Sequence, residues 1–159
     1  MQTGQSTHIA EFNRGILKYD WDRPEIAEFQ NNLDRVNILA ARSDGFVWRM
    51  DDDAMEAAQL DLNGPLGGNP RLASTLSVWT STQALSNFVH KTVHGKFMKK
   101  RDIWFEKSEG PAHVIWPVTV GHTPTVQEAA KRLEMLGVNG PTSLAYDFNW
   151  WRENALSVE

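Results

Sequence analysis

Two histidines four residues apart, His90 and His94, form the titratable pair with the most suggestive spacing in the chain. Residues four apart on a continuous helix share a face, and two neighbouring imidazoles can hold a metal ion or transfer a proton. A metal would need a third ligand, such as His113 or His122. Alternatively, one histidine lines a ligand pocket, or both make ordinary hydrogen bonds, and we predict no metal site. We prefer His94 as the functional residue because it lies next to Gly95, where the helix should bend.

Asn13 is the second candidate for chemistry. It alternates with Glu11 onto the same face of a predicted strand. The amide N–H₂ group of an asparagine that faces a cavity can orient a substrate carbonyl or bound dioxygen. The alternative is an edge or turn position before Arg14, without a role in a site. We predict Asn13 and His94 as the catalytic residues.

Arg49 directly follows Trp48 on another predicted strand, so the two side chains point to opposite faces. An Arg49 that faces a cavity could anchor an anionic ligand by a bidentate contact. The favoured alternative is an ion pair with the acidic run Asp51–Asp53 or with Glu56. The three aspartates lack the spacing of a calcium-binding loop, and we expect them at the solvated tip of a hairpin.

Large aromatic side chains around these groups would exclude water from a pocket. The chain has seven tryptophans, for which a bulky core and an oligomer interface are the favoured explanation and an aromatic-lined cavity is the alternative. His122 precedes a predicted helix and is either a lid over the pocket or an ordinary loop residue. The predicted ligand-binding residues are Trp48, Arg49, Trp79, Phe88, His90, Trp104 and His122.

The composition excludes several classes of function. The absence of cysteine excludes disulfides, thiolate metal ligands and cysteine nucleophiles. A net charge of −4 without a basic stripe argues against nucleic acid as a partner. No apolar run approaches the ~20 residues of a membrane span, and the N-terminal residues lack a signal-peptide core. We expect one cytoplasmic domain over residues 1–159, with its core from about 8 to 148 and no membrane partner.

The elements that position these groups alternate between strands and helices. We predict strands at His8–Asn13 with an extension over Ile16–Tyr19, at Phe46–Met50, at Leu72–Trp79 and at Ala112–Val118, and a last extended segment at Leu144–Trp151. Capping boxes predict helices that run from Asp22 to about Gly45, from Thr80 through the bend to Phe105, and from Thr125 to Gly137 or Gly140. Pro117 predicts that the strand containing it lies at a sheet edge or a bulge.

This order, β-α-β-β-α-β and a further helix, is the ferredoxin-like order. A four-stranded antiparallel sheet would carry both main helices on one face, and the other face must be covered as well. The rest of the chain is too short to cover it, so we predict a homodimer in which two sheets face each other around a cavity. The expected fold class is α+β, a ferredoxin-like protomer forming a dimeric α/β barrel.

The strand-to-helix sequence Val78-Trp79-x-Ser81-x-x-Ala84-Leu85-x-x-Phe88 resembles the signature of the dimeric α/β-barrel superfamily, whose best-known branch is the antibiotic-biosynthesis and haem-degrading monooxygenases. Across roughly His8 to Phe148 the chain is similar to a bacterial family of unknown function with that fold. The residues that carry this similarity are Gly45–Arg49, Leu76–Trp79, Phe88-Val89 with His94, Arg101-x-x-Trp104-Phe105 and Gly121-His122-x-Pro124-Thr125. The resemblance implies the fold and dimerisation.

The haem-degrading branch uses an asparagine on its first strand, and a tryptophan and a histidine on its second helix. Asn13 resembles that asparagine and His94 that histidine, whereas Phe88, which has no N–H group, stands where the tryptophan would be. We therefore predict a protein that binds a small apolar or aromatic molecule and acts as a cofactor-independent monooxygenase or a related enzyme. The alternatives are a non-catalytic hydrophobic-ligand-binding or stress-response module, and a haem-binding protein with a helical histidine as axial ligand.

Overall fold

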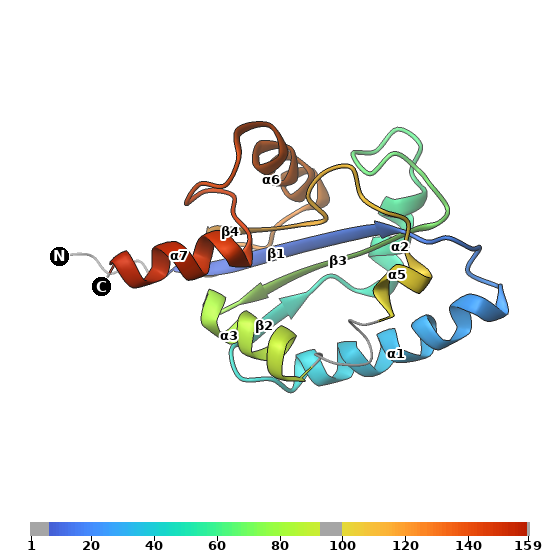
Figure 1. The fold of residues 1–159 in the computed structure, drawn as a ribbon, viewed down its shortest axis with the longest axis horizontal. Coiled ribbons are helices and arrows are strands. Elements are labelled where there is room, and N and C mark those ends of the chain that lie inside the picture. Colours follow the sequence, from blue (N-terminus) through green and yellow to red (C-terminus); the bar gives the residue numbers. More distant parts are fainter. Residues whose placement is uncertain (1–6, 93–99, 159) are drawn as a thin grey trace.

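A computed structural model describes residues 7–92 and 100–158. The fold is mixed α+β, with a four-stranded antiparallel sheet in the order β2-β3-β1-β4 (Figure 1). The strands are β1 Thr7–Ile16, β2 Phe46–Arg49, β3 Leu72–Trp79 and β4 His113–Thr119. The helices are α1 Pro24–Ala41, α2 Asp52–Leu60, α3 Thr82–Asn87, the π-turn η1 Phe88–Thr92, α5 Arg101–Trp104, α6 Val126–Asn139 and α7 Phe148–Val158.

Strand β1 lies at the centre of the sheet, between β3 and β4. Its side chains alternate between two faces. Ile9, Glu11 and Asn13 point to the face that α1 and α3 cover, which we call the α1 face. Ala10 and Phe12 point to the opposite side, which α6 covers and which we call the α6 face. The four predicted strands are therefore confirmed, but the predicted extension over Ile16–Tyr19 is not, because β1 ends at Ile16.

The α6 face is buried within the chain itself. Phe12, Leu76, Val114 and Trp116 are fully buried there, in one apolar cluster with Met55 of α2 and side chains from α6. The prediction that this face is open and needs a second subunit to cover it is wrong. Two helices of the same chain, α2 and α6, cover it instead.

The α1 face is covered by α1, α3, α5 and the first turns of α7. Two apolar clusters lie between these helices and the sheet. One cluster centres on Trp79, Phe88 and Ile115, and the other on Leu17, Phe29 and Trp104. The sheet is thus enclosed between helices on both sides (Figure 1).

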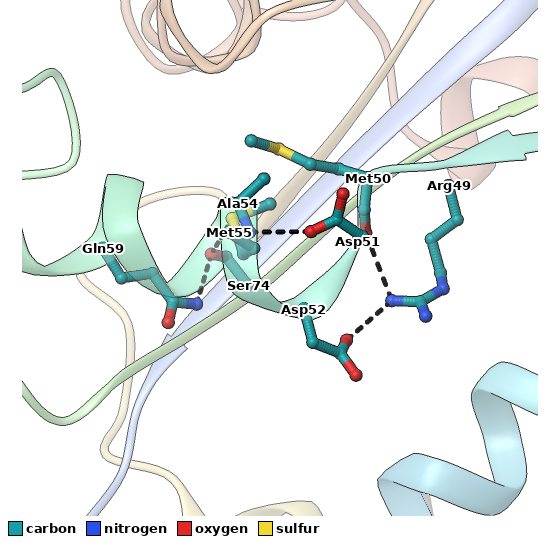
Figure 2. Close-up of polar contacts among 8 residues, drawn as sticks. All are labelled: Arg49, Met50, Asp51, Asp52, Ala54, Met55, Gln59 and Ser74. Carbon is teal, nitrogen blue, oxygen red and sulfur yellow. Dashed lines mark hydrogen bonds and ion pairs between the residues drawn. The ribbon is translucent and has the colours of Figure 1, made fainter.

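Helix α2 begins within the acidic run that we assigned to a hairpin tip. Asp51 is its N-cap and accepts a hydrogen bond from the Ala54 N–H at 2.8 Å, while Asp52 and Asp53 occupy the first turn. Carboxylates are favourable there because they face the positive end of the helix dipole. Arg49 pairs with Asp52 at 2.9 Å (Figure 2). The ion-pair alternative for Arg49 is therefore confirmed, and the hairpin tip is wrong.

Two predicted caps are shifted by one residue. The N-cap of α1 is Arg23 rather than Asp22, without a side-chain cap, although Pro24 opens the helix as expected. The cap of α3 is Ser81 rather than Thr80, and its hydroxyl accepts from the Ala84 N–H at 3.1 Å. The caps of α6, Thr125 at its start and Gly140 at its end, are as predicted. The predicted bend at Gly95 lies outside the described residues.

The last predicted extended segment becomes helical from Phe148 on. Before that point, Tyr146 pairs with Ile115 of β4 through two backbone hydrogen bonds of 2.8 Å, and Ala145 forms an isolated bridge with Thr142. Asp147 then accepts a hydrogen bond from the Trp150 N–H at 2.9 Å, as an N-terminal cap does, and α7 follows. Pro117 lies on β4, an edge strand of the sheet as expected. No helix in the described ranges 7–92 and 100–158 is long and apolar enough to cross a membrane.

Gly45 joins α1 to β2 with φ at 86°, a conformation that disfavours any side chain. A Cβ atom there would also collide with the Ala84 side chain and the Thr80 hydroxyl. We expect Gly45→Ala to lower the free energy of unfolding by about 2 kcal/mol. Gly121→Ala is the matched control, because Gly121 has φ at 93° but open space around it, and it should cost about 1 kcal/mol. Equal losses in urea unfolding of the two variants would show that the collision at Gly45 is absent.

Candidate functional site

Glu11 is the buried carboxyl group at the middle of the α1 face. It lies on β1 opposite Ser77 of β3 and Ile115 of β4, and only 8% of the residue is exposed. Burial raises the pKa of Glu11 from 4.5 to about 7, and the hydrogen bond from Asn13 only partly opposes this rise. A carboxyl with a pKa near the working pH can both accept and donate a proton. Glu11 is therefore suited to general acid–base chemistry.

Asn13 holds the Glu11 carboxyl in place. Its Nδ2 donates to the two carboxyl oxygens at 3.0 and 3.2 Å and to Thr75 Oγ1 at 2.7 Å. Asn13 faces Thr75 directly across the β1–β3 ladder, so this chain of bonds is fixed by the strand register. Because the amide hydrogens are used within the protein, Asn13 positions Glu11 rather than offering its N–H₂ group to a substrate.

His113 faces Asn13 across the β1–β4 ladder and shares the α1 face with it. Its ring stacks on Phe148 with the centroids 5.3 Å apart. Burial lowers the pKa of His113, and Arg101 and His90 add to this effect while Asp147 opposes it. Its Nε2 atom is buried and has no hydrogen-bond partner among the described residues. Such an atom costs about 1–3 kcal/mol, which a polar ligand atom would offset.

His90 is already bonded on both sides of its ring. Nδ1 lies 3.0 Å from the Ser86 carbonyl oxygen, and Nε2 lies 3.2 Å from the Arg152 guanidinium. Because arginine only donates, Nε2 must accept, and the proton is on Nδ1. His90 therefore joins η1 to α7. A short π-helix such as η1 is often found at functional sites. Both ring nitrogens of His90, however, already form hydrogen bonds within the protein.

Aromatic rings line the α1 face on both sides of the polar group. Trp79 stacks on Phe88 at 5.2 Å between centroids, and its Nε1 donates to Ser77 Oγ at 3.0 Å. Trp104 packs at the other end of the face, 5.3 Å from the Phe29 ring. The structure thus brings five of the predicted site residues to one face: Asn13, Trp79, Phe88, His90 and Trp104.

Three predicted residues lie elsewhere, and one is not described. Trp48 packs on the α6 face, and the Arg49 guanidinium is bound to Asp52 at the start of α2. His122 pairs with Glu128 of α6 at 2.7 Å. His94 lies outside the described residues, so its predicted catalytic role stays a prediction.

Glu128 has a structural role under His122. Its other oxygen accepts from Trp116 Nε1 at 2.8 Å. Partial burial favours the neutral form of this carboxyl, but the hydrogen bonds from His122 and Trp116 outweigh it, so the pKa of Glu128 is lowered overall. His122 therefore belongs to the anchoring of α6 on the sheet rather than to the group around Glu11.

The main residues that sequence reasoning did not select are Glu11 and His113. Glu11 was visible as a lone carboxylate within an apolar strand, on the same face as Asn13. His113 entered only as a possible third metal ligand, because its place beside Asn13 depends on the β1–β4 register. In the described part of the chain, no three histidine, aspartate or glutamate side chains gather in a way that could hold a metal ion.

Comparisons with known proteins identify the family but no reaction. No curated protein matches the chain. A crystal structure of a protein of unknown function from Nitrosomonas europaea is similar, with 13% identity and a TM-score of 0.46, over 77% of this chain and 97% of that chain. SnoaB, a cofactor-independent oxygenase from Streptomyces nogalater, is similar with 16% identity and a TM-score of 0.41, over 73% of this chain and 95% of that chain. Residues 8–156 match the Domain of unknown function (DUF3291), and the chain belongs to that family.

Proposed function

We propose that the protein is an enzyme that binds a small, uncharged aromatic or other apolar molecule on the α1 face and removes a proton from it with Glu11. The observation that carries the proposal is a buried carboxyl with a pKa of about 7, held by Asn13 in a strand register shared with His113. Proton removal from an activated carbon is the first step that a cofactor-independent oxygenation requires. An uncharged substrate is expected because burial disfavours the charged forms of both Glu11 and His113.

Each group has a definite role in this scheme. The ionised Glu11 takes a proton from a methylene carbon next to a ketone, and the substrate becomes an enolate. The unpartnered Nε2 of His113 can donate to the enolate oxygen when it carries the ring proton. Asn13 and Thr75 orient the carboxyl, and Trp79 and Phe88 exclude water. The enolate then reduces dioxygen, and the methylene carbon becomes a carbonyl with release of one water.

The sheet order supports a ferredoxin-like protomer of the dimeric α/β-barrel kind. Read from β4, the order is β4-β1-β3-β2, and α1 and α3 lie on one face. We also propose that the protein is a homodimer. In a shared barrel, the two subunits would meet through the open faces of their sheets. Here α2 and α6 bury the α6 face, so the second subunit would bind at a different surface. Sedimentation that shows only monomer at micromolar concentration would contradict the dimer.

Anthrone, a three-ring ketone with an acidic methylene, is a suitable probe for the proposed reaction. Wild-type protein should consume one dioxygen per anthrone and form anthraquinone and one water, measured with an oxygen electrode and by absorbance. Because the ionised carboxyl is the base, the rate should rise with pH through about 7. Glu11→Gln should lower the rate at least 100-fold. Asn13→Ala should lower it less and shift the pH midpoint upward, because Asn13 lowers the pKa of Glu11.

Other outcomes separate the alternatives. A Glu11→Gln variant as fast as the wild type would contradict the role of Glu11. Saturable binding of anthrone without oxygen uptake would favour a non-catalytic binding module. Haem binding rests on His94 and is tested by titration with haemin: a Soret shift that His94→Ala abolishes would support it. The same shift in both proteins would exclude His94 as the ligand.

A further inference from the structure

Two neighbouring clefts on the surface form one groove along α6. Their volumes are about 520 and 400 Å³, within the ordinary range for small-molecule sites. Both are lined by Arg14, Pro111 and Leu133, so they adjoin at these residues. We call the two adjoining clefts together the α6 groove. It contains none of Glu11, Asn13 and His113, and is therefore distinct from the candidate site on the α1 face.

The two ends of the α6 groove differ in chemistry. The smaller cleft reaches down to the buried residues Phe12 and Leu66 and is otherwise mostly apolar, while the exposed residues Glu134 and Val138 also line it. The larger cleft has a charged lining. Besides Arg14, its charged residues are Arg101, Lys107, Asp102, Glu106 and Glu109. Three cations and three carboxylates give this end no net positive charge, which disfavours phosphates and other multiply charged anions.

Arg14 stands where the two clefts meet. It follows Asn13 on β1, so its side chain leaves the sheet on the α6 face, opposite Ser74. Arg14 is half-buried, yet its guanidinium forms no ion pair or hydrogen bond with another residue of the ranges 7–92 and 100–158. Arg49 and Arg71, in contrast, pair with nearby aspartates.

Arg14 is half-buried and shares a cleft with Phe12 and Leu66, so the residue has lost hydration and has no partner that compensates for this loss. A single carboxylate would compensate, because the planar guanidinium matches a carboxylate in a bidentate contact. We propose that the α6 groove binds a free monocarboxylate with an apolar body, with the carboxylate on Arg14 and the body in the smaller cleft.

Twelve-carbon probes that differ only in the head group test the proposal. Sodium dodecanoate, dodecanol and dodecyltrimethylammonium are titrated into the protein by calorimetry, the two ionic probes below their micelle concentrations and dodecanol below its solubility limit. Dodecanoate should bind one-to-one and at least tenfold more tightly than dodecanol, and the cation should not bind. Arg14→Gln should weaken dodecanoate at least tenfold and leave dodecanol unchanged, and Arg14→Lys should keep part of the preference.

Gly137 offers a second, independent test at the apolar end. A Cβ atom there would lie 3.5 Å from Pro111 Cδ, an ordinary contact, so Gly137→Ala should fold and bind as the wild type does. Gly137→Met would fill the smaller cleft and should weaken dodecanoate and dodecanol alike. Circular dichroism will show whether Arg14→Gln folds. If it does not, the Gly137 variants still test whether the α6 groove is the binding site, because they keep Arg14.

Several results would overturn the proposal. One is equal affinity of the wild type for dodecanoate and dodecanol. Another is unchanged dodecanoate binding in a folded Arg14→Gln variant, and a third is unchanged affinity for both probes in Gly137→Met. Binding to phosphatidylglycerol vesicles without binding of free dodecanoate would assign the surface to a membrane instead. None of these results depends on oxygen uptake with anthrone, so the two proposals can fail separately.

Discussion

Glu11→Gln is expected to be more stable than the wild type at pH 8, by roughly 3 kcal/mol, and about equally stable at pH 4. The carboxyl of Glu11 has its ordinary pKa near 4.5 in the unfolded chain and about 7 in the folded protein. Between these values the unfolded chain loses the proton first, so the stability of the wild type falls as the pH rises. Each unit of difference corresponds to about 1.4 kcal/mol. Glutamine keeps an oxygen for Asn13 but never ionises.

Unfolding in urea at half-unit steps from pH 4 to pH 8 measures this effect as the difference between the two proteins. The two proteins must be compared because His113 makes the stability change with pH in the opposite direction. Its lowered pKa means that the unfolded chain takes up a proton first as the pH falls, which destabilises the folded protein on the acidic side. This contribution is the same in both proteins and cancels. Parallel stability curves would contradict the raised pKa of Glu11, and with it the basis of the proposed reaction.

Trp79→Ala should lower the free energy of unfolding by about 3–5 kcal/mol. The ring is 1% exposed, stacks on Phe88 and meets Phe46 edge-on at 5.4 Å. Its removal leaves a large cavity between β3 and η1, which the rigid sheet cannot close. The midpoint of guanidinium unfolding should fall while its slope stays unchanged.

Trp79→Phe is the matched control. It keeps an aromatic ring in the stack and loses the indole N–H that bonds to Ser77, so it should cost clearly less than alanine. A loss below 1 kcal/mol in Trp79→Ala would mean that the ring is not buried as described. A loss as large in Trp79→Phe as in Trp79→Ala would assign the effect to the hydrogen bond rather than to packing.

The strands could be predicted because alternation is a local signal. In β1 and β3, apolar residues recur on one face beside mixed ones on the other, and their predicted bounds were close to those observed. The start of helix α2 was missed because Asp51–Asp53 was interpreted as a hairpin tip, although an aspartate followed by a helix-forming segment is also an N-cap. In α7, the aromatic residues Phe148, Trp150 and Trp151 favoured a strand, and the capping role of Asp147 was overlooked.

Only part of the candidate site could be predicted from the sequence, because the rest depends on contacts between distant segments. Glu11 and Asn13 are two residues apart, so their shared face follows from strand geometry alone. The place of His113 depends on which residue of β4 lies opposite Asn13, and the bond to Thr75 depends on the register with β3. Pairings between distant strands leave no trace in a local pattern. The unpartnered state of His113 Nε2 follows from packing and could not be predicted at all.

The backbone pairing of Tyr146 with Ile115 bears on how the protein avoids aggregation. Unpaired strand edges invite other chains to add to a sheet. Tyr146 occupies the middle of one edge, on β4. On the other edge, β2 has only four residues, and its register shifts between Phe46 and Trp48. Neither edge of the described sheet therefore offers a long, regular template, and the protein should stay dispersed at concentrations at which open-edged sheets form fibres.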